Sequence, residues 1–209
     1  MKTPSTPPAI AALLFDMGGV VIDIDFERAL QIWTSHSRLP IDQIRGRFSM
    51  DEAYAQHEIG EIGAVEYFAH LRERLELSAS DAEICAGWNA IFKAEISQSV
   101  DYILAVRDKI PCYAFTNSNP THQVYWAAAY PRVVDSFHRV FVSSELGLRK
   151  PHREAFEAIS EFSGKALQEM LFFDDLEENV DGARAAGLQA VHVKTHRDVR
   201  KALQETGLL

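Results

Sequence analysis

The sequence has little cysteine. Cys85 and Cys112 are its two cysteines among 209 residues. They lie far apart, in no spacing typical of a metal site, and two cysteines do not make a disulfide framework. Such sparse use of cysteine is typical of proteins from a reducing compartment, so we expect a cytoplasmic protein.

Long apolar runs and basic runs are also missing. Asp and Glu number 30 against 21 Lys and Arg, a formal net charge of −9. Nucleic acids and anionic membranes attract proteins with a positive field, so we expect neither as a partner. The longest stretch without a charged residue, 111–131, contains Thr, Asn, Ser, His and Gln, which predicts no membrane span. Residues 1–9 resemble neither a signal peptide nor an anchor, and we expect a disordered tail there.

The apolar pattern predicts an α/β fold. A short apolar run over 10–15 is typical of a buried parallel strand, and similar runs recur at 112–115, 140–142, 170–173 and 190–193, separated by segments with helical patterns. Strands alternating with helices predict a Rossmann-like open parallel sheet. The block 26–96 shows only helical spacing. We therefore expect a core formed by 10–25 and 97–209, interrupted by an inserted α-helical cap at 26–96.

Polar residues stand where the predicted strands end. Asp16 follows the first strand, Thr116 the second, and the pair Asp174 and Asp175 a later one, while Lys150 precedes a helix. Each alone is most simply a turn or cap residue. Ligands of open α/β sheets bind beyond the carboxyl ends of the strands, so the four segments together predict one site.

These segments resemble the motifs of a known superfamily. Phe15-Asp16-Met17-Gly18, Thr116-Asn117-Ser118-Asn119, Gly147-Leu148-Arg149-Lys150-Pro151 and Phe172-Phe173-Asp174-Asp175 look like those of the haloacid dehalogenase (HAD) superfamily, most of whose members are Mg²⁺-dependent phosphatases. The helical insertion matches the subfamily with a C1 cap. Asp23-Ile24-Asp25-Phe26, Gln56-His57-Glu58 and Gly60-Glu61-Ile62 extend the likeness to bacterial α-D-glucose-1-phosphate phosphatases.

The resemblance implies a nucleophile and a metal site. Asp16 would attack phosphorus, forming an aspartyl-phosphate intermediate, and would also ligate Mg²⁺. Asp175 would ligate the metal directly, Asp174 through a water, and Gly18 through its backbone carbonyl. A few carboxylates with waters suit Mg²⁺.

The same resemblance implies the substrate contacts. The Thr116 hydroxyl and the Asn117 backbone N–H would hold phosphate oxygens, and Lys150 would pair with both Asp16 and the phosphoryl group. His57, Glu58 and Glu61 of the cap are candidates for substrate contact, although each also fits a solvated surface position. Asn179 and His122 likewise remain open between site and ordinary helix roles.

Gly18 departs from the superfamily pattern. Most phosphatases of the superfamily carry there an Asp that protonates the leaving oxygen, a role worth about 10²–10⁴-fold. The glucose-1-phosphate phosphatases also have Gly at this position, and an anomeric oxygen needs less protonation. Gly18 therefore favours sugar 1-phosphates or other activated leaving groups. Asp23 is a candidate substitute base, although its alternation with apolar neighbours also fits the polar side of a hairpin.

We thus expect a Mg²⁺-dependent phosphomonoester hydrolase that acts on a small phosphorylated metabolite, such as glucose 1-phosphate. One alternative is a haloacid dehalogenase, whose chemistry uses no metal and leaves the pair Asp174 and Asp175 unexplained. The other is a catalytically weak phosphate-binding regulator, suggested by Gly18. Nothing in the sequence indicates the oligomeric state.

Overall fold

The computed structural model describes residues 9–209 and has a five-stranded parallel sheet at its centre. The strands are β1 (Ala12–Phe15), β4 (Cys112–Thr116), β5 (Arg139–Val142), β6 (Met170–Asp174) and β7 (Gln189–His192). Their order is β5-β4-β1-β6-β7, with β1 in the middle. The predicted open parallel α/β sheet is therefore confirmed, including all five strand positions to within two residues.

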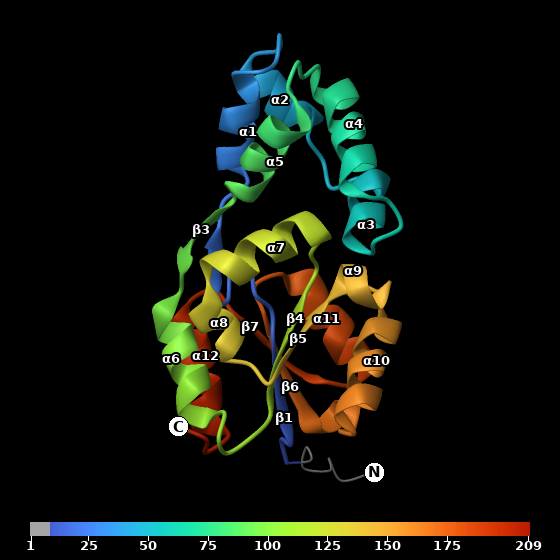
Figure 1. Cartoon of the computed structure of the whole chain (residues 1–209). Coiled ribbons are helices and arrows are strands. Elements are labelled where there is room, and N and C mark those ends of the chain that lie inside the picture. The colour runs from blue at the N-terminus through green and yellow to red at the C-terminus, as the bar shows by residue number, and fades with distance from the viewer. Residues whose placement is uncertain (1–8) are drawn as a thin grey trace.

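Helices cover both faces of the sheet, as crossover connections require. On one side lie α6 (Ser97–Val106) and α12 (His196–Glu205), and on the other α10 (Arg153–Ser163) and α11 (Glu177–Ala186) (Figure 1). The side chains of alternate residues of β1 point to opposite faces of the sheet. Leu13 and Phe15 join the apolar cluster of the first side, and Ala12 and Leu14 that of the second.

Three further helices belong to the core: α7 (Pro120–Ala129) follows β4, α8 (Pro131–Asp135) precedes β5, and α9 (Ser143–Leu146) follows β5. A 3₁₀ turn, Leu167–Glu169, precedes β6. Pro120 begins α7 as expected, because the first turn of a helix tolerates its missing N–H. Among the described residues, no helix combines the length and apolar character needed to span a membrane.

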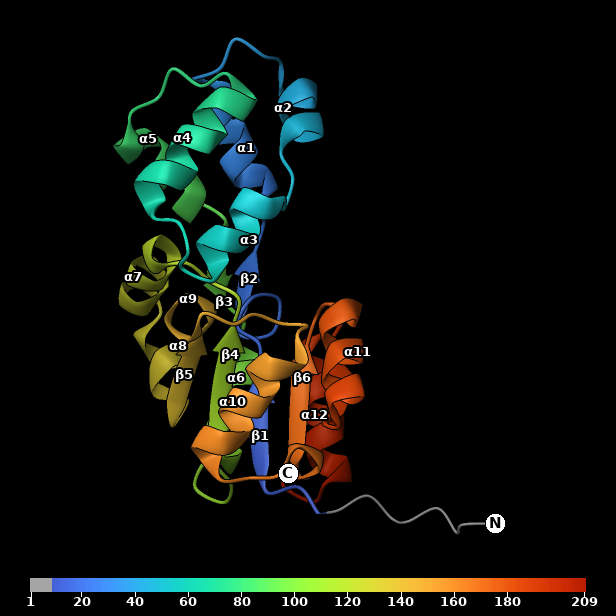
Figure 2. The ribbon, with the colours of Figure 1, turned by 90° about the vertical axis from the view of Figure 1, so that its right-hand side faces the viewer.

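A second group of helices forms a lobe above the sheet (Figure 2). We call α1 (Glu27–Thr34), α2 (Ile41–Arg47), α3 (Glu52–Glu58), α4 (Ala64–Leu75) and α5 (Asp81–Asn89) the helical lobe. Trp33 and Trp88 stack at its centre, with ring centroids 5.8 Å apart. The predicted capping box of Ser80 and Glu83 begins α5.

One sequence prediction for this region was wrong. The segment 26–96 contains a strand, β3 (Phe92–Glu95), which pairs antiparallel with β2 (Ile22–Ile24) and links the lobe to the core. The helical spacing of the apolar residues in α5 extends to Phe92, so the sequence predicts helix there. A four-residue segment acquires strand structure here from a partner about 70 residues away, and local spacing contains no trace of that pairing. The expected tail, 1–9, lies outside the described residues apart from Ala9.

Candidate active site

Three neighbouring strands carry acidic and hydroxyl groups to one end of the sheet. Asp16 directly follows β1, Thr116 ends β4 and Asp174 ends β6. Because β1 pairs in parallel with both β4 and β6, these carboxyl ends are adjacent. All three residues are buried. The strand-end argument from the sequence therefore brings these groups together as expected.

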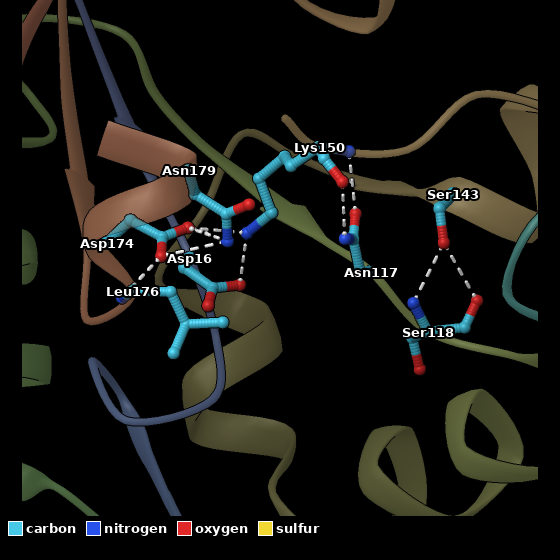
Figure 3. A network of polar contacts seen from close by, with 8 residues as sticks. All are labelled: Asp16, Asn117, Ser118, Ser143, Lys150, Asp174, Leu176 and Asn179. Carbon is cyan, nitrogen blue, oxygen red and sulfur yellow. Dashed lines mark hydrogen bonds and ion pairs between the residues drawn. The ribbon is translucent and has the colours of Figure 1, made fainter. Parts of the chain in front are cut away.

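Lys150 lies between two of these carboxylates. Its Nζ is 2.7 Å from Asp16 Oδ1 and 2.8 Å from Asp174 Oδ2, and its side chain is 1% exposed (Figure 3). Burial alone would lower the pKa of this ammonium, but the two carboxylates raise it above its ordinary value. Lys150 is therefore a fixed positive charge between Asp16 and Asp174.

Asp174 and Asp175 are positioned by local contacts. Asp174 Oδ1 accepts hydrogen bonds from the backbone N–H of Leu176 at 2.9 Å and from Asn179 Nδ2 at 3.0 Å (Figure 3). Asn179 is thus a buried residue that orients a carboxylate. Gly19, with φ of +69°, lies so close to Asp175 that a Cβ atom there would overlap the carboxylate.

Asp16, Asp174 and Asp175 form a cluster suited to a divalent cation. One carboxylate oxygen from each lies within 4.8 Å of the others. Lys150 offers one positive charge against three carboxyl groups. Burial, with the neighbouring carboxylates, raises the pKa of Asp16 to about 8 and that of Asp175 to about 6. A bound divalent cation would supply the missing positive charge, and oxygen donors are those that Mg²⁺ prefers. The residues present therefore fit this metal.

Asn117 holds the loop that carries Lys150. Its Oδ1 accepts a hydrogen bond from the Lys150 backbone N–H at 2.9 Å, and its Nδ2 donates to the Lys150 carbonyl at 3.0 Å (Figure 3). The adjacent Ser118 N–H donates to Ser143 Oγ at 2.8 Å, and Ser143 Oγ donates to the Glu58 carbonyl at 2.6 Å. The carboxyl end of β4 is thereby joined both to the loop that carries Lys150 and to the helical lobe.

A cavity of about 340 Å³ lies between the sheet end and the helical lobe. Asp16, Gly18, Thr116, Lys150 and Asp175 line its floor. The lobe contributes side chains from α3 and from the segments before α1 and α3. A cavity of this size is at the small end of the range for ligand sites, and its polar floor can hold an anion.

Glu58 and Arg149 join the lobe to the core along this cavity. Arg149 Nη2 lies 3.0 Å from Glu58 Oε2. Burial raises the pKa of Glu58, whereas Arg149 acts in the opposite direction. Glu58 also accepts a hydrogen bond from Tyr54. The sequence motifs contain both residues, but their charge pairing across the two parts depends on the tertiary fold.

Three residues considered from the sequence lie outside this cavity. His57 is buried within the lobe, with Nδ1 3.1 Å from the Ile62 carbonyl, and its ring stacks on Tyr67 at 4.6 Å. Glu61 is exposed in the loop after α3. Asp23 pairs with Lys93 at 2.8 Å on the β2–β3 ribbon. Glu58, which the sequence also offered as a candidate for substrate contact, does line the cavity.

His122 is a buried cavity residue without a free ring nitrogen. Its Nε2 lies 3.1 Å from the Trp88 carbonyl and its Nδ1 lies 3.2 Å from Asn119 Nδ2. Burial lowers its pKa to about 3, so the ring is neutral. The surface role weighed for it from the sequence is therefore wrong.

Sequence reasoning missed most of the cavity lining above the floor. Ile24, Phe26, Met50 and Phe92 line the cavity. Ile24 and Phe26 stand in one of the motifs but have no role assigned from the sequence, and Met50 and Phe92 are ordinary apolar residues there. The pattern marks them as inward-facing and does not distinguish a core from a ligand cavity.

Comparisons with known proteins agree with this geometry. Residues 10–187 match the family of haloacid dehalogenase-like hydrolases. The chain is 25% identical to a D-ribitol-5-phosphate phosphatase of Bacteroides thetaiotaomicron, over 93% of this chain and 97% of that protein. It is 27% identical to a sesquiterpene phosphatase of Aspergillus oryzae, over 87% of this chain and 89% of that protein. A HAD family enzyme of Bacteroides thetaiotaomicron, solved with magnesium and inorganic phosphate, superposes with a TM-score of 0.77 at 30% identity, covering 87% of this chain and 93% of that one.

Proposed function

This chain belongs to the haloacid dehalogenase-like hydrolases, and we propose that it is a Mg²⁺-dependent phosphatase that acts through a phosphorylated Asp16. The observation that carries the proposal is the position of Lys150, 2.7 Å from Asp16 and 2.8 Å from Asp174 at the cavity floor. The buried ammonium acts against the rise in the pKa of Asp16 that burial causes, and it offers charge to an incoming phosphate. Relatives named as phosphatases support the same reaction.

Asp16, Asp174 and Asp175 would hold the metal, with the Gly18 carbonyl as a further candidate ligand. When bound, Mg²⁺ neutralises the repulsion between the carboxylate nucleophile and the phosphate. Thr116 Oγ1 and the Asn117 backbone N–H would donate to phosphate oxygens, and both residues line the cavity. Lys150 would pair with the transferred phosphoryl group as well as with Asp16.

The reaction proceeds in two displacements at phosphorus. A carboxylate oxygen of Asp16 forms a bond to phosphorus while the ester P–O bond breaks, and the organic group leaves as an alkoxide. Gly18 carries no proton donor, so the leaving oxygen takes its proton from water. A water molecule then attacks the phosphorus, which releases inorganic phosphate and regenerates the carboxylate of Asp16.

The helical lobe would act as a cap in this reaction. In our proposal, 26–96 is the cap and the remainder of 10–209 the core. The Glu58–Arg149 pair and the hydrogen bond from Ser143 to Glu58 hold the cap against the core. A closed cap limits the entry of water around the phosphoryl group.

Similarity alone does not select the organic part of the substrate. The sequence favours a sugar phosphate such as glucose 1-phosphate, and the D-ribitol-5-phosphate phosphatase is consistent with a polyol ester. The sesquiterpene phosphatase acts, by its name, on a hydrocarbon skeleton. A small phosphorylated metabolite is the common proposal. Cys85 and Cys112 are free thiols, which supports the expected cytoplasmic location.

The test is phosphate release from a panel of phosphomonoesters with Mg²⁺ or with EDTA, with Asp16→Asn as the control. We expect release that requires Mg²⁺ and falls at least about 10³-fold in Asp16→Asn. Turnover of a 2-haloacid, unaffected by EDTA, would favour the dehalogenase reaction instead. Binding of magnesium and phosphate without turnover of any ester would favour a regulatory protein.

A further inference from the structure

The upper part of the cavity is lined by hydrocarbon. We call the side chains of Ile24, Phe26, Met50, Ile91, Phe92 and Trp126 the apolar wall. They come from β2, from β3 and its approach, from α7 and from the segments before α1 and α3, so both parts of the molecule contribute. Aromatic contacts hold several of them in place. Phe26 packs on Trp88 at 6.0 Å and Phe92 packs edge-on against His122 at 4.9 Å. The wall is therefore a preformed apolar surface.

The polar side chains of the cavity outside its acidic floor already have partners within the protein. Both amide atoms of Asn117 bond to the Lys150 backbone. Both ring nitrogens of His122 are engaged. Ser118 Oγ accepts from Trp126 Nε1 at 3.2 Å. The amide of Asn117 and the ring of His122 cannot turn to a ligand without breaking contacts that hold the site.

The pair of Glu58 and Arg149 offers few further polar contacts to a ligand. Each is the other's charge partner at 3.0 Å, and Glu58 also accepts from Tyr54. Arg149 Nε has no hydrogen-bond partner. Glu58 Oε2 likewise has no hydrogen-bond partner beyond its charge contact with Arg149. This pair can therefore contact a polar atom of a ligand on one side of the cavity, whereas six apolar side chains form the wall.

We propose that the organic group of the substrate is an apolar hydrocarbon, aromatic or aliphatic, seated against the apolar wall, and that polyol phosphates are poor substrates. This inference rests on the proposed phosphatase function and specifies its substrate class. A hydroxyl group placed against the wall loses its hydrogen bonds to water and gains none, which is unfavourable. A methylene group in the same place is favoured by leaving water.

Two phosphate monoesters with the same linear five-carbon chain separate the alternatives. Pentyl phosphate and D-ribitol 5-phosphate are both primary esters and differ in the hydroxyl groups of the chain. The hydroxyl groups make the ribitol oxygen the better leaving group, so chemistry alone favours the polyol. We expect kcat/KM for pentyl phosphate to exceed that for ribitol 5-phosphate by at least about tenfold, and benzyl phosphate to rank with the pentyl ester.

Met50 provides the matched variants. It lines the cavity and is 58% exposed, so a polar replacement there is compatible with folding. We expect Met50→Gln to lower the pentyl-to-ribitol ratio several-fold and Met50→Leu to preserve it. Val65 is 71% exposed on α4, away from the cavity, and Val65→Gln serves as the control for a polar replacement in the lobe.

The possible outcomes are distinct. A ratio that favours the pentyl ester and falls in Met50→Gln but not in Met50→Leu supports the inference. Mg²⁺-dependent release that is equal or faster with ribitol 5-phosphate overturns it and leaves the phosphatase function standing. Absence of Mg²⁺-dependent release from every ester, with no difference between wild type and Asp16→Asn, overturns the proposed function and the inference together.

Discussion

A Cβ atom added to Gly18 would lie 3.0 Å from Ile24 Cδ1. The isoleucine side chain thus fills the space beside the glycine, where a carboxylate at this position would begin. Gly18 and Ile24 both line the cavity. Ile24 therefore belongs to the apolar wall and also occupies the space that the side chain of a proton donor at position 18 would need.

Gly18→Asp tests the missing proton donor. We expect it to raise kcat for esters with poor leaving groups, such as glucose 6-phosphate, by up to about 10²-fold, and to change glucose 1-phosphate less. The gain in kcat should be larger when Gly18→Asp is combined with Ile24→Ala, because the smaller side chain makes room for the carboxylate. Gly18→Asn, of similar size without an acidic proton, is the control. An equal gain on both esters would refute the leaving-group explanation.

Lys150 is predicted to be required for stability as well as activity. Lys150→Met leaves Asp16 and Asp174 buried without their cation, and we expect a loss of about 3 kcal/mol or more in the free energy of unfolding in EDTA. We expect kcat to fall about 10²–10³-fold. Lys201→Met, at an exposed lysine paired with Glu205, is the control. Chemical denaturation of both variants measures the difference, and equal stability would contradict the assigned ion pairs.

Mg²⁺ is predicted to stabilise the fold through the acidic cluster. Binding to the native state alone adds about 2.7 kcal/mol at a concentration a hundred times Kd. We expect thermal denaturation to show a rise in Tm with Mg²⁺ that Asp175→Asn greatly reduces. Asp181→Asn, at an exposed carboxylate of α11, should keep the full rise. A rise that is the same in all three proteins would place the ion elsewhere.

His122 predicts a loss of stability in acid. Burial lowers its pKa from 6.5 to about 3 in the folded state. The unfolded chain therefore binds the proton more readily between these values, and stability falls as the pH falls through that range. One such group contributes about 1.4 kcal/mol per pH unit. Urea denaturation at pH 6.5 and 4.5 measures the decline in the free energy of unfolding. This decline should be smaller in His122→Gln than in the wild type. It should be unchanged in His152→Gln, the control at an exposed histidine. Parallel declines in all three proteins would contradict this assignment.

The core of the fold could be predicted because its signals are local. Each strand of the parallel sheet is a short apolar run, and the helices that follow begin at recognisable residues, such as Pro120 in the first turn of α7 and Thr195 at the N-cap of α12. β3 could not be predicted in this way, because Phe92–Glu95 becomes a strand through its pairing with Ile22–Ile24. The same ribbon places Asp23 beside Lys93, away from the cavity.

The floor of the site was predictable and its upper part was not. Asp16, Thr116 and Asp174 occupy strand ends, whose place in an α/β sheet follows from topology. The choice of Glu58 over His57 and Glu61 depends on which face of α3 meets the core, and a short helix with polar residues on several faces does not specify this. The apolar wall gathers Ile24, Met50 and Phe92 from separate segments, and their spacing resembles that of any core.

The central claim is that Asp16 carries the phosphoryl group during turnover. The direct measurement is mass spectrometry of the protein quenched in acid during turnover of benzyl phosphate with Mg²⁺. We expect a phosphoryl group on the peptide that contains Asp16, removed by hydroxylamine and absent from Asp16→Asn. Steady turnover without any phosphorylated protein, undiminished in Asp16→Asn, would contradict the account.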